Sequence, residues 1–344
     1  MTERPLLQRL VPLCAAAALA LPLAAGCGLR LRMVDSSVRK PSNVAVYFAV
    51  VDHNKQPVPN LTAEQFQIYE DDHLVSKFES KQTILNPEVA AVQYTLLLVD
   101  MSGSVAQSGM VPQLVEAASG FAEKVGTTQQ VAVYAFDGAK ELHPVVGFTS
   151  GGGAVRGGLS ALNGYKPRDP STNLNGAVIE GLKVLQQKME SSTQPLRFAT
   201  LVVFTDGSDR AHRVPREQLK KTLDEYETTV NMFAIGVGAE IDESELREVG
   251  RTEYVLQKNP AEVKQAFDRI AARVDNFTRS FYLLSYCSPA RAGKHKVRIA
   301  ANAPGRGTGD MEYDFDATGF GPNCDPNTPP NFDVHNPRAL RRKR

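Results

Sequence analysis

A carboxylate and two hydroxyl side chains lie within five residues, directly after an apolar run of the chain. Residues 94–99 are almost continuously apolar, and Asp100, Ser102 and Ser104 follow them. Such a run is typical of a strand buried on both faces of a parallel sheet, and open α/β sheets bind ligands where these strands end. Oxygen ligands suit a hard cation such as Mg²⁺, and Gly103 allows a tight turn around it. The sequence therefore predicts a metal site here.

The pattern Asp-x-Ser-x-Ser resembles the metal-ion-dependent adhesion site of von Willebrand factor type A domains. That family adds a threonine from a later loop and an aspartate after a later strand. Thr172 stands at the threonine position, within the segment Ser-Thr-Asn-Leu-Asn, and Asp206 stands at the aspartate position, after Val-Val-Phe-Thr. The resemblance covers roughly residues 93–278 and matches all five positions in order.

The resemblance implies a metal-dependent binding protein. In the family, the hydroxyls coordinate the metal directly and the aspartates often act through water. Here, Ser102, Ser104 and Thr172 would bind Mg²⁺, or Mn²⁺ or Ca²⁺, and Asp100 and Asp206 would assist. Neutral hydroxyls leave the charge of the cation poorly neutralised, so an Asp or Glu from a protein partner would complete the ligand shell. We therefore expect protein binding and no enzymatic activity.

Other interpretations of the same residues lead elsewhere. An EF-hand calcium loop beginning at Asp100 is excluded, because Val105 and Val111 stand where Gly and Glu are required. The Ser and Asp residues can also simply make turns and cap helices, or hold a metal that staples three loops of an envelope scaffold. A magnesium-dependent phosphohydrolase is the enzymatic alternative, although no glycine-rich or basic phosphate cradle accompanies the turn.

Other chemistries find no support in the composition. The six histidines are scattered and form no His-Glu-x-x-His pattern. Ser102 lies outside any Gly-x-Ser-x-Gly segment, which argues against a hydrolase nucleophile. The 39 Lys and Arg residues nearly balance the 38 Asp and Glu residues, so no basic field points to nucleic acid.

Alternating strand and helix patterns predict that residues 93–278 form a doubly wound, Rossmann-like α/β domain that positions the metal loops. Its last predicted helix, residues 261–277, has apolar residues along one face. Residues 43–92 and 279–316 show strand patterns, but each has too few strands to be stable alone. We therefore predict a small antiparallel β-sandwich with the type A domain inserted into it, an arrangement that resembles bacterial von Willebrand factor A-related proteins.

The first 26 residues have the organisation of a secretory signal peptide, with two arginines before an Ala/Leu-rich run. The end of this segment, Leu-Ala-Ala-Gly before Cys27, resembles a bacterial lipoprotein box, which implies lipidation of the cysteine and a membrane anchor. Ordinary signal cleavage and an uncleaved anchor stay open, because the leucine stands one position early. Gly28 in place of Asp favours the outer membrane, so we expect a lipid-anchored protein of the bacterial cell envelope, facing the periplasm or the surface.

The ends of the mature chain give three further predictions. Residues 27–42 carry four basic residues and are expected to be a tether. Residues 317–344 are rich in Pro, Asn and Gly and end in a basic run, which predicts a disordered tail. Cys287 and Cys324 are the cysteines outside the signal and the lipid box, and in an oxidising compartment they predict a disulfide.

Overall fold

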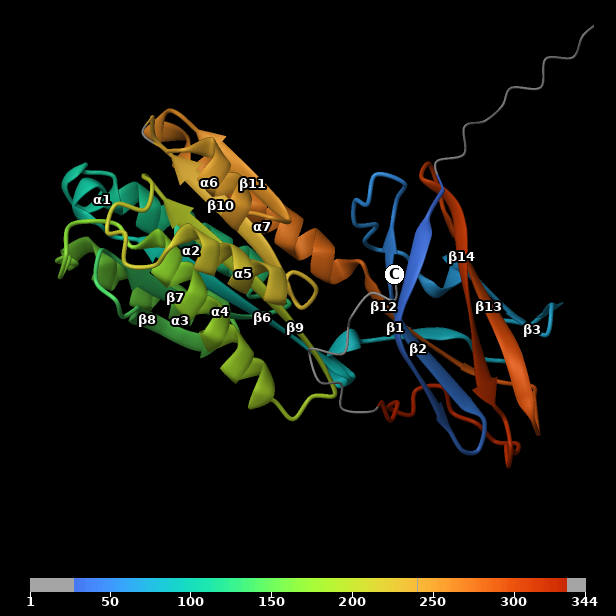
Figure 1. The fold of residues 1–344 in the computed structure, drawn as a ribbon. Coiled ribbons are helices and arrows are strands. Elements are labelled where there is room, and N and C mark those ends of the chain that lie inside the picture. Colours follow the sequence, from blue (N-terminus) through green and yellow to red (C-terminus); the bar gives the residue numbers. More distant parts are fainter. Residues whose placement is uncertain (1–27, 240, 333–344) are drawn as a thin grey trace, which may run out of the picture.

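The apolar runs in the middle of the chain form one six-stranded sheet in the computed structural model, which describes residues 28–239 and 241–332 (Figure 1). The strand order is β11-β10-β9-β6-β7-β8, and every neighbouring pair is parallel except β7 with β8. Parallel strands end at the same edge, so the loops that follow β6, β7 and β9 come together there. The strands are β6 (Ala91–Asp100), β7 (Gln130–Phe136), β8 (His143–Thr149), β9 (Leu196–Thr205), β10 (Val230–Val237) and β11 (Glu253–Gln257).

Helices cover both faces of this sheet, which explains why its central strands are apolar at successive positions. Leu97 and Val99 pack in one core layer with α2, α3 and α7, whereas Leu96 and Leu98 pack in the other with α4, α5 and α6. None of the helices within the described residues is both long and apolar enough to span a membrane. The helices are α1 (Gly103–Gln107), α2 (Val111–Val125), α3 (Gly152–Leu159), α4 (Leu174–Glu190), α5 (Arg216–Tyr226), α6 (Glu243–Val249) and α7 (Val263–Arg279).

Two four-stranded sheets lie at one end of this α/β unit (Figure 1). Their orders are β1-β2-β12-β5 and β14-β13-β3-β4, and all their pairs are antiparallel. Strands that precede the central sheet thus pair with strands that follow α7, and the two sheets share one apolar core. The predicted fold class, a doubly wound sheet accompanied by antiparallel sheets, is confirmed. The strands are β1 (Arg30–Arg39), β2 (Asn43–Val51), β3 (Phe66–Glu70), β4 (His73–Leu74), β5 (Thr83–Leu85), β12 (Phe281–Cys287), β13 (Lys294–Ala303) and β14 (Gly307–Asp316).

The segment expected to be a basic tether contains strand β1, so that prediction was wrong for residues 30–39. This strand pairs antiparallel with β2, and the N–H of Leu29 just before it donates to the carbonyl of Thr308 at 2.8 Å. It is the edge strand of its sheet and most of its side chains are partly or fully exposed. An exposed edge strand tolerates charged residues. The arginines of β1 therefore interrupt the apolar pattern from which a strand would be predicted.

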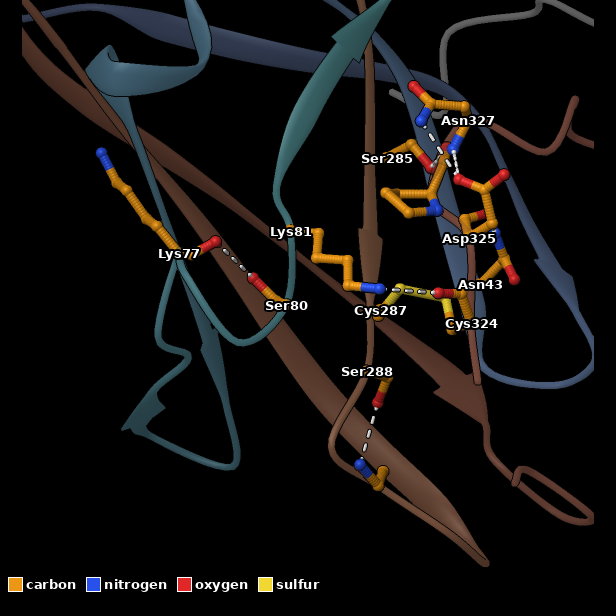
Figure 2. Close-up of a disulfide and its surroundings, with 12 residues drawn as sticks. Asn43, Lys77, Ser80, Lys81, Ser285, Cys287, Ser288, Cys324, Asp325 and Asn327 are labelled. Atoms are coloured by element: carbon orange, nitrogen blue, oxygen red, sulfur yellow. Dashed lines mark hydrogen bonds between the residues drawn. A yellow bond between two sulfur atoms is a disulfide. The ribbon is translucent and has the colours of Figure 1, made fainter. Parts of the chain in front are cut away.

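The expected disordered tail is ordered as far as residue 332, and the predicted disulfide is confirmed (Figure 2). Cys287 and Cys324 are bonded with their Cα atoms 5.7 Å apart. Ser285 Oγ then donates to the carbonyl of Pro326 at 2.7 Å, and Phe332 is buried in a core cluster at the junction with the central sheet. Residues 1–27, with the signal peptide and Cys27, and residues 333–344 lie outside the described residues.

An ion pair between His295 and Asp71 gives stability a pH dependence. His295 Nδ1 lies 2.7 Å from Asp71 Oδ2, and this contact raises the pKa of His295 above its ordinary value. Because the folded pKa is the higher one, the stabilisation is present below the unfolded pKa of about 6.5 and is lost as pH rises through the folded value. His295→Gln should therefore lower the melting temperature more at about pH 5.5 than at about pH 8.5. Thermal unfolding at both pH values tests this, and an equal loss at both would contradict it.

Candidate metal centre

The residues that follow β6 form a turn at the carboxyl end of the central sheet, and Ser104 is its exposed residue. Asp100, the last residue of β6, and Ser102 are both fully buried. The N–H of Ser102 donates to Asp100 Oδ1 at 2.9 Å, and the hydroxyls of Ser102 and Ser104 are 3.2 Å apart. Ser102 occupies the N-cap position of α1, but its side chain makes no capping hydrogen bond. Helix capping therefore does not account for its hydroxyl.

Asp206 joins this group from the loop after β9. Ser104 Oγ donates to Asp206 Oδ1 at 2.9 Å across 102 residues of sequence. Thr205, the last residue of β9, donates from its hydroxyl to Asp100 Oδ2 at 2.7 Å. The neighbouring parallel strands β6 and β9 thus bring four of the five predicted residues together.

Thr172 reaches the same edge on the loop before α4. The carbonyl of Pro170 accepts from the N–H of Gly103 at 2.8 Å, which joins this loop to the turn after β6. The carbonyl of Thr172 accepts from the N–H groups of Arg210 and Ala211, both at 2.9 Å, which joins it to the loop after β9. Thr172 is 4% exposed, and hydrogen bonds join its segment to the loop after β6 and to the loop after β9.

The electrostatics of the turn favour a cation. Burial and, second, the nearby charge of Asp206 raise the pKa of Asp100 to about 7. A divalent ion beside Asp100 and Asp206 would relieve this repulsion, and a set of carboxylates and hydroxyls fits the oxygen preference of Mg²⁺ or Mn²⁺. Within the described ranges, no group of three or more His, Cys, Asp or Glu side chains is placed to hold a metal. A metal at this edge would therefore depend on the hydroxyl ligands.

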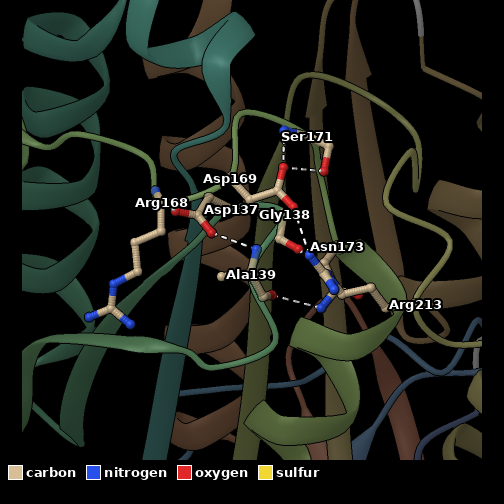
Figure 3. Close-up of polar contacts among 8 residues, drawn as sticks. All are labelled: Asp137, Gly138, Ala139, Arg168, Asp169, Ser171, Asn173 and Arg213. Carbon is tan, nitrogen blue, oxygen red and sulfur yellow. Dashed lines mark hydrogen bonds and ion pairs between the residues drawn. The ribbon is translucent and has the colours of Figure 1, made fainter.

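The turn that follows β7 was not predicted from the sequence. Asp137 is 2% exposed and accepts hydrogen bonds from the loop that leads to Thr172 (Figure 3). A signal was available, because Asp137 and Gly138 follow an apolar strand, as Asp100 does. Thr205 was also missed, since a threonine inside a strand is ordinary on propensity grounds.

One family model matches the chain. Residues 95–208 match the model described as von Willebrand factor type A domain. Together with the order of the central sheet, this match supports a von Willebrand factor type A domain in the middle of the chain. No curated protein sequence matches the chain.

Similar solved structures have low sequence identity. A von Willebrand factor type A protein from Catenulispora acidiphila is 10% identical, with 85% of this chain and 74% of that chain covered and a TM-score of 0.46. Proximal thread matrix protein 1 of the mussel byssus is 17% identical (60% and 49% covered, TM-score 0.40), so the chain spans about half its length. Manganese-loaded TRAP protein of Plasmodium vivax is 14% identical (70% and 98% covered, TM-score 0.45). Because every TM-score is below 0.5, these likenesses carry no functional conclusion.

Proposed function

We propose that this protein binds a protein partner through a divalent metal, Mg²⁺ or Mn²⁺, at the carboxyl edge of the central sheet. The observation that carries the proposal is the hydrogen-bonded series of Ser102, Ser104 and Asp206, which joins two distant loops through side-chain oxygens alone. Together with Asp100 and Thr172, these three residues stand at the five positions that the type A family uses to hold its metal. The match to the family model covers all five residues.

The five residues would contribute two kinds of oxygen ligand to the metal. Ser102, Ser104 and Thr172 would offer neutral hydroxyl oxygens, and Asp100 and Asp206 would offer charge directly or through water. A bound metal would supply positive charge that the protein only partly neutralises, so a carboxylate of the partner would be a favourable further ligand. Hydrogen bonds already join the three loops. This argues against a metal whose only role is to hold these loops together.

We further propose where in the cell this protein acts. Residues 93–278 would be the binding domain, and residues 43–92 and 279–316, together with β1, would form the β-sandwich that holds it away from a membrane. Lipid on Cys27 would anchor the chain in the bacterial cell envelope, at the outer membrane. The disulfide supports export, because such bonds persist in oxidising compartments.

Cys27→Ser should abolish incorporation of labelled fatty acid, and undiminished labelling would contradict the anchor.

Partner binding can be tested with the metal as the variable. The protein is immobilised in Mg²⁺, exposed to envelope extract, and eluted with EDTA. We expect specific proteins in the EDTA eluate that are absent when Asp206→Ala replaces the wild type. Asp310→Ala, a matched change at an exposed position of β14, should retain them. Retention by Asp206→Ala, or binding that resists EDTA, would contradict metal-dependent binding.

A further inference from the structure

One buried carboxylate, that of Asp137, is among the groups that join the turn after β7 to the loop of residues 165–173 (Figure 3). Asp137 Oδ2 accepts from the hydroxyl of Tyr165 at 3.0 Å and from the N–H of Arg168 at 2.7 Å, and its Oδ1 accepts from the N–H of Ala139 at 2.7 Å. A carboxylate with 2% exposure is tolerated because such hydrogen bonds replace its lost water. Within the described part of the chain, the carboxylate of Asp137 accepts from Ala139, Tyr165 and Arg168 and from none of the proposed metal ligands.

The turn also fixes the residue that follows Thr172. The N–H of Asn173 donates to the carbonyl of Asp137 at 3.0 Å, and Asn173 Nδ2 donates to the carbonyl of Ala139 at 2.9 Å. The same side chain accepts from the N–H of Gly176 at 3.2 Å and so caps α4. Asn173 thus joins the turn after β7 to the start of that helix.

The residues before Thr172 are held by a second set of contacts. Gly138 N–H donates to the carbonyl of Asp169 at 3.0 Å, and the carboxylate of Asp169 accepts from Ser171 and is paired with Arg213 at 2.7 Å. Arg213 Nε also donates to the carbonyl of Gly138. A Cβ atom on Gly138 would lie 2.1 Å from Ser171 Oγ. The loop therefore approaches the turn so closely that a side chain at position 138 would force Ser171 and Asp169 to shift.

We propose that Asp137 is a positioning residue that holds Thr172 at the metal edge before a metal binds. The inference rests on the proposed function, because it concerns affinity for the same metal. A loop that is already ordered loses less conformational freedom on binding, which raises affinity. Loss of a group that orients a metal ligand typically weakens metal binding about 10- to 100-fold.

The test is calorimetric titration of Mn²⁺ into the full chain in detergent. Asp137→Asn preserves shape, but an amide has only one accepting atom and cannot accept from both Ala139 and Arg168. We expect its Kd for Mn²⁺ to rise about 10- to 100-fold. Asp310→Asn, the same chemical change at an exposed position of β14, should leave the Kd unchanged.

A double variant separates positioning from general destabilisation. If Asp137 acts through Thr172, then Asp137→Asn should have little further effect on the Kd when Thr172→Ala is already present. An unchanged Kd in folded Asp137→Asn would overturn the inference. So would a double variant whose fold-change in Kd equals the product of the two single fold-changes.

If Asp137→Asn does not fold, Tyr165→Phe removes one donor and leaves the carboxylate. A weaker Mn²⁺ affinity in that variant supports positioning, and an unchanged affinity overturns it. If the wild type binds no Mn²⁺, or if Ser102→Ala binds it equally well, the proposed function fails together with this inference. Failure of the Asp137 variants alone leaves the proposed function standing.

Discussion

Ser102→Ala is expected to weaken Mg²⁺ and Mn²⁺ binding by at least about 100-fold, because loss of a direct ligand should exceed the effect of losing a group that only orients one. The hydroxyl of Ser102 is fully buried, does not cap α1, and lies 3.2 Å from the hydroxyl of Ser104. Alanine fits the same space, so the chain should remain folded. Calorimetric titration of both metals measures the loss.

A control at a buried serine distinguishes ligand loss from a packing effect. Ser119, on α2, is also buried, and its hydroxyl donates to the carbonyl of Val115 at 2.7 Å within the helix. Ser119→Ala should retain the metal affinity of the wild type. Equal affinities for Ser102→Ala and the wild type would show that the predicted hydroxyl is not a metal ligand.

Loss of the disulfide is expected to reduce the free energy of unfolding by about 3–4 kcal/mol, the chain-entropy value for a loop of this length. The bond joins residues 37 positions apart and holds the tail against the sheet that contains β12. Without it, the tail would be held only by hydrogen bonds such as that of Ser285 and by the apolar packing of residues such as Phe332. Urea unfolding of the double variant Cys287→Ser/Cys324→Ser measures the loss.

Reduction provides the matching control for this second prediction. Dithiothreitol should destabilise the wild type by a similar amount and should leave the double variant unchanged. A loss below about 1 kcal/mol would mean that the ordered tail contributes little to stability and that the entropic account of this bond does not apply.

The central sheet was predictable because its signal is local. The run that forms β6 is apolar at successive positions, which is typical of a strand covered on both faces. Strand β1 gives no such signal. Its order comes from pairing with β2 at an exposed edge, where arginines are tolerated. The tail was mispredicted for a similar reason, because a few anchors such as Cys324 and Phe332 order a segment whose composition indicates disorder.

The candidate site likewise contains residues that could be predicted from the sequence and one that could not. Asp100, Ser102 and Ser104 form one turn, so their spacing is visible in the sequence. Asp137 lies in a different loop, and its link to Thr172 exists only once β7 and the loop before α4 are brought together. An Asp-Gly pair after a strand usually signals only a turn, so the sequence alone did not distinguish this position.

Diffraction from crystals soaked in Mn²⁺ would test the central claim most directly, because the anomalous signal locates the metal. The account predicts a peak within coordination distance of the hydroxyl oxygens of Ser102, Ser104 and Thr172, and its absence in crystals of Ser102→Ala. A peak elsewhere, or none at this edge in the wild type, would contradict the proposed metal centre.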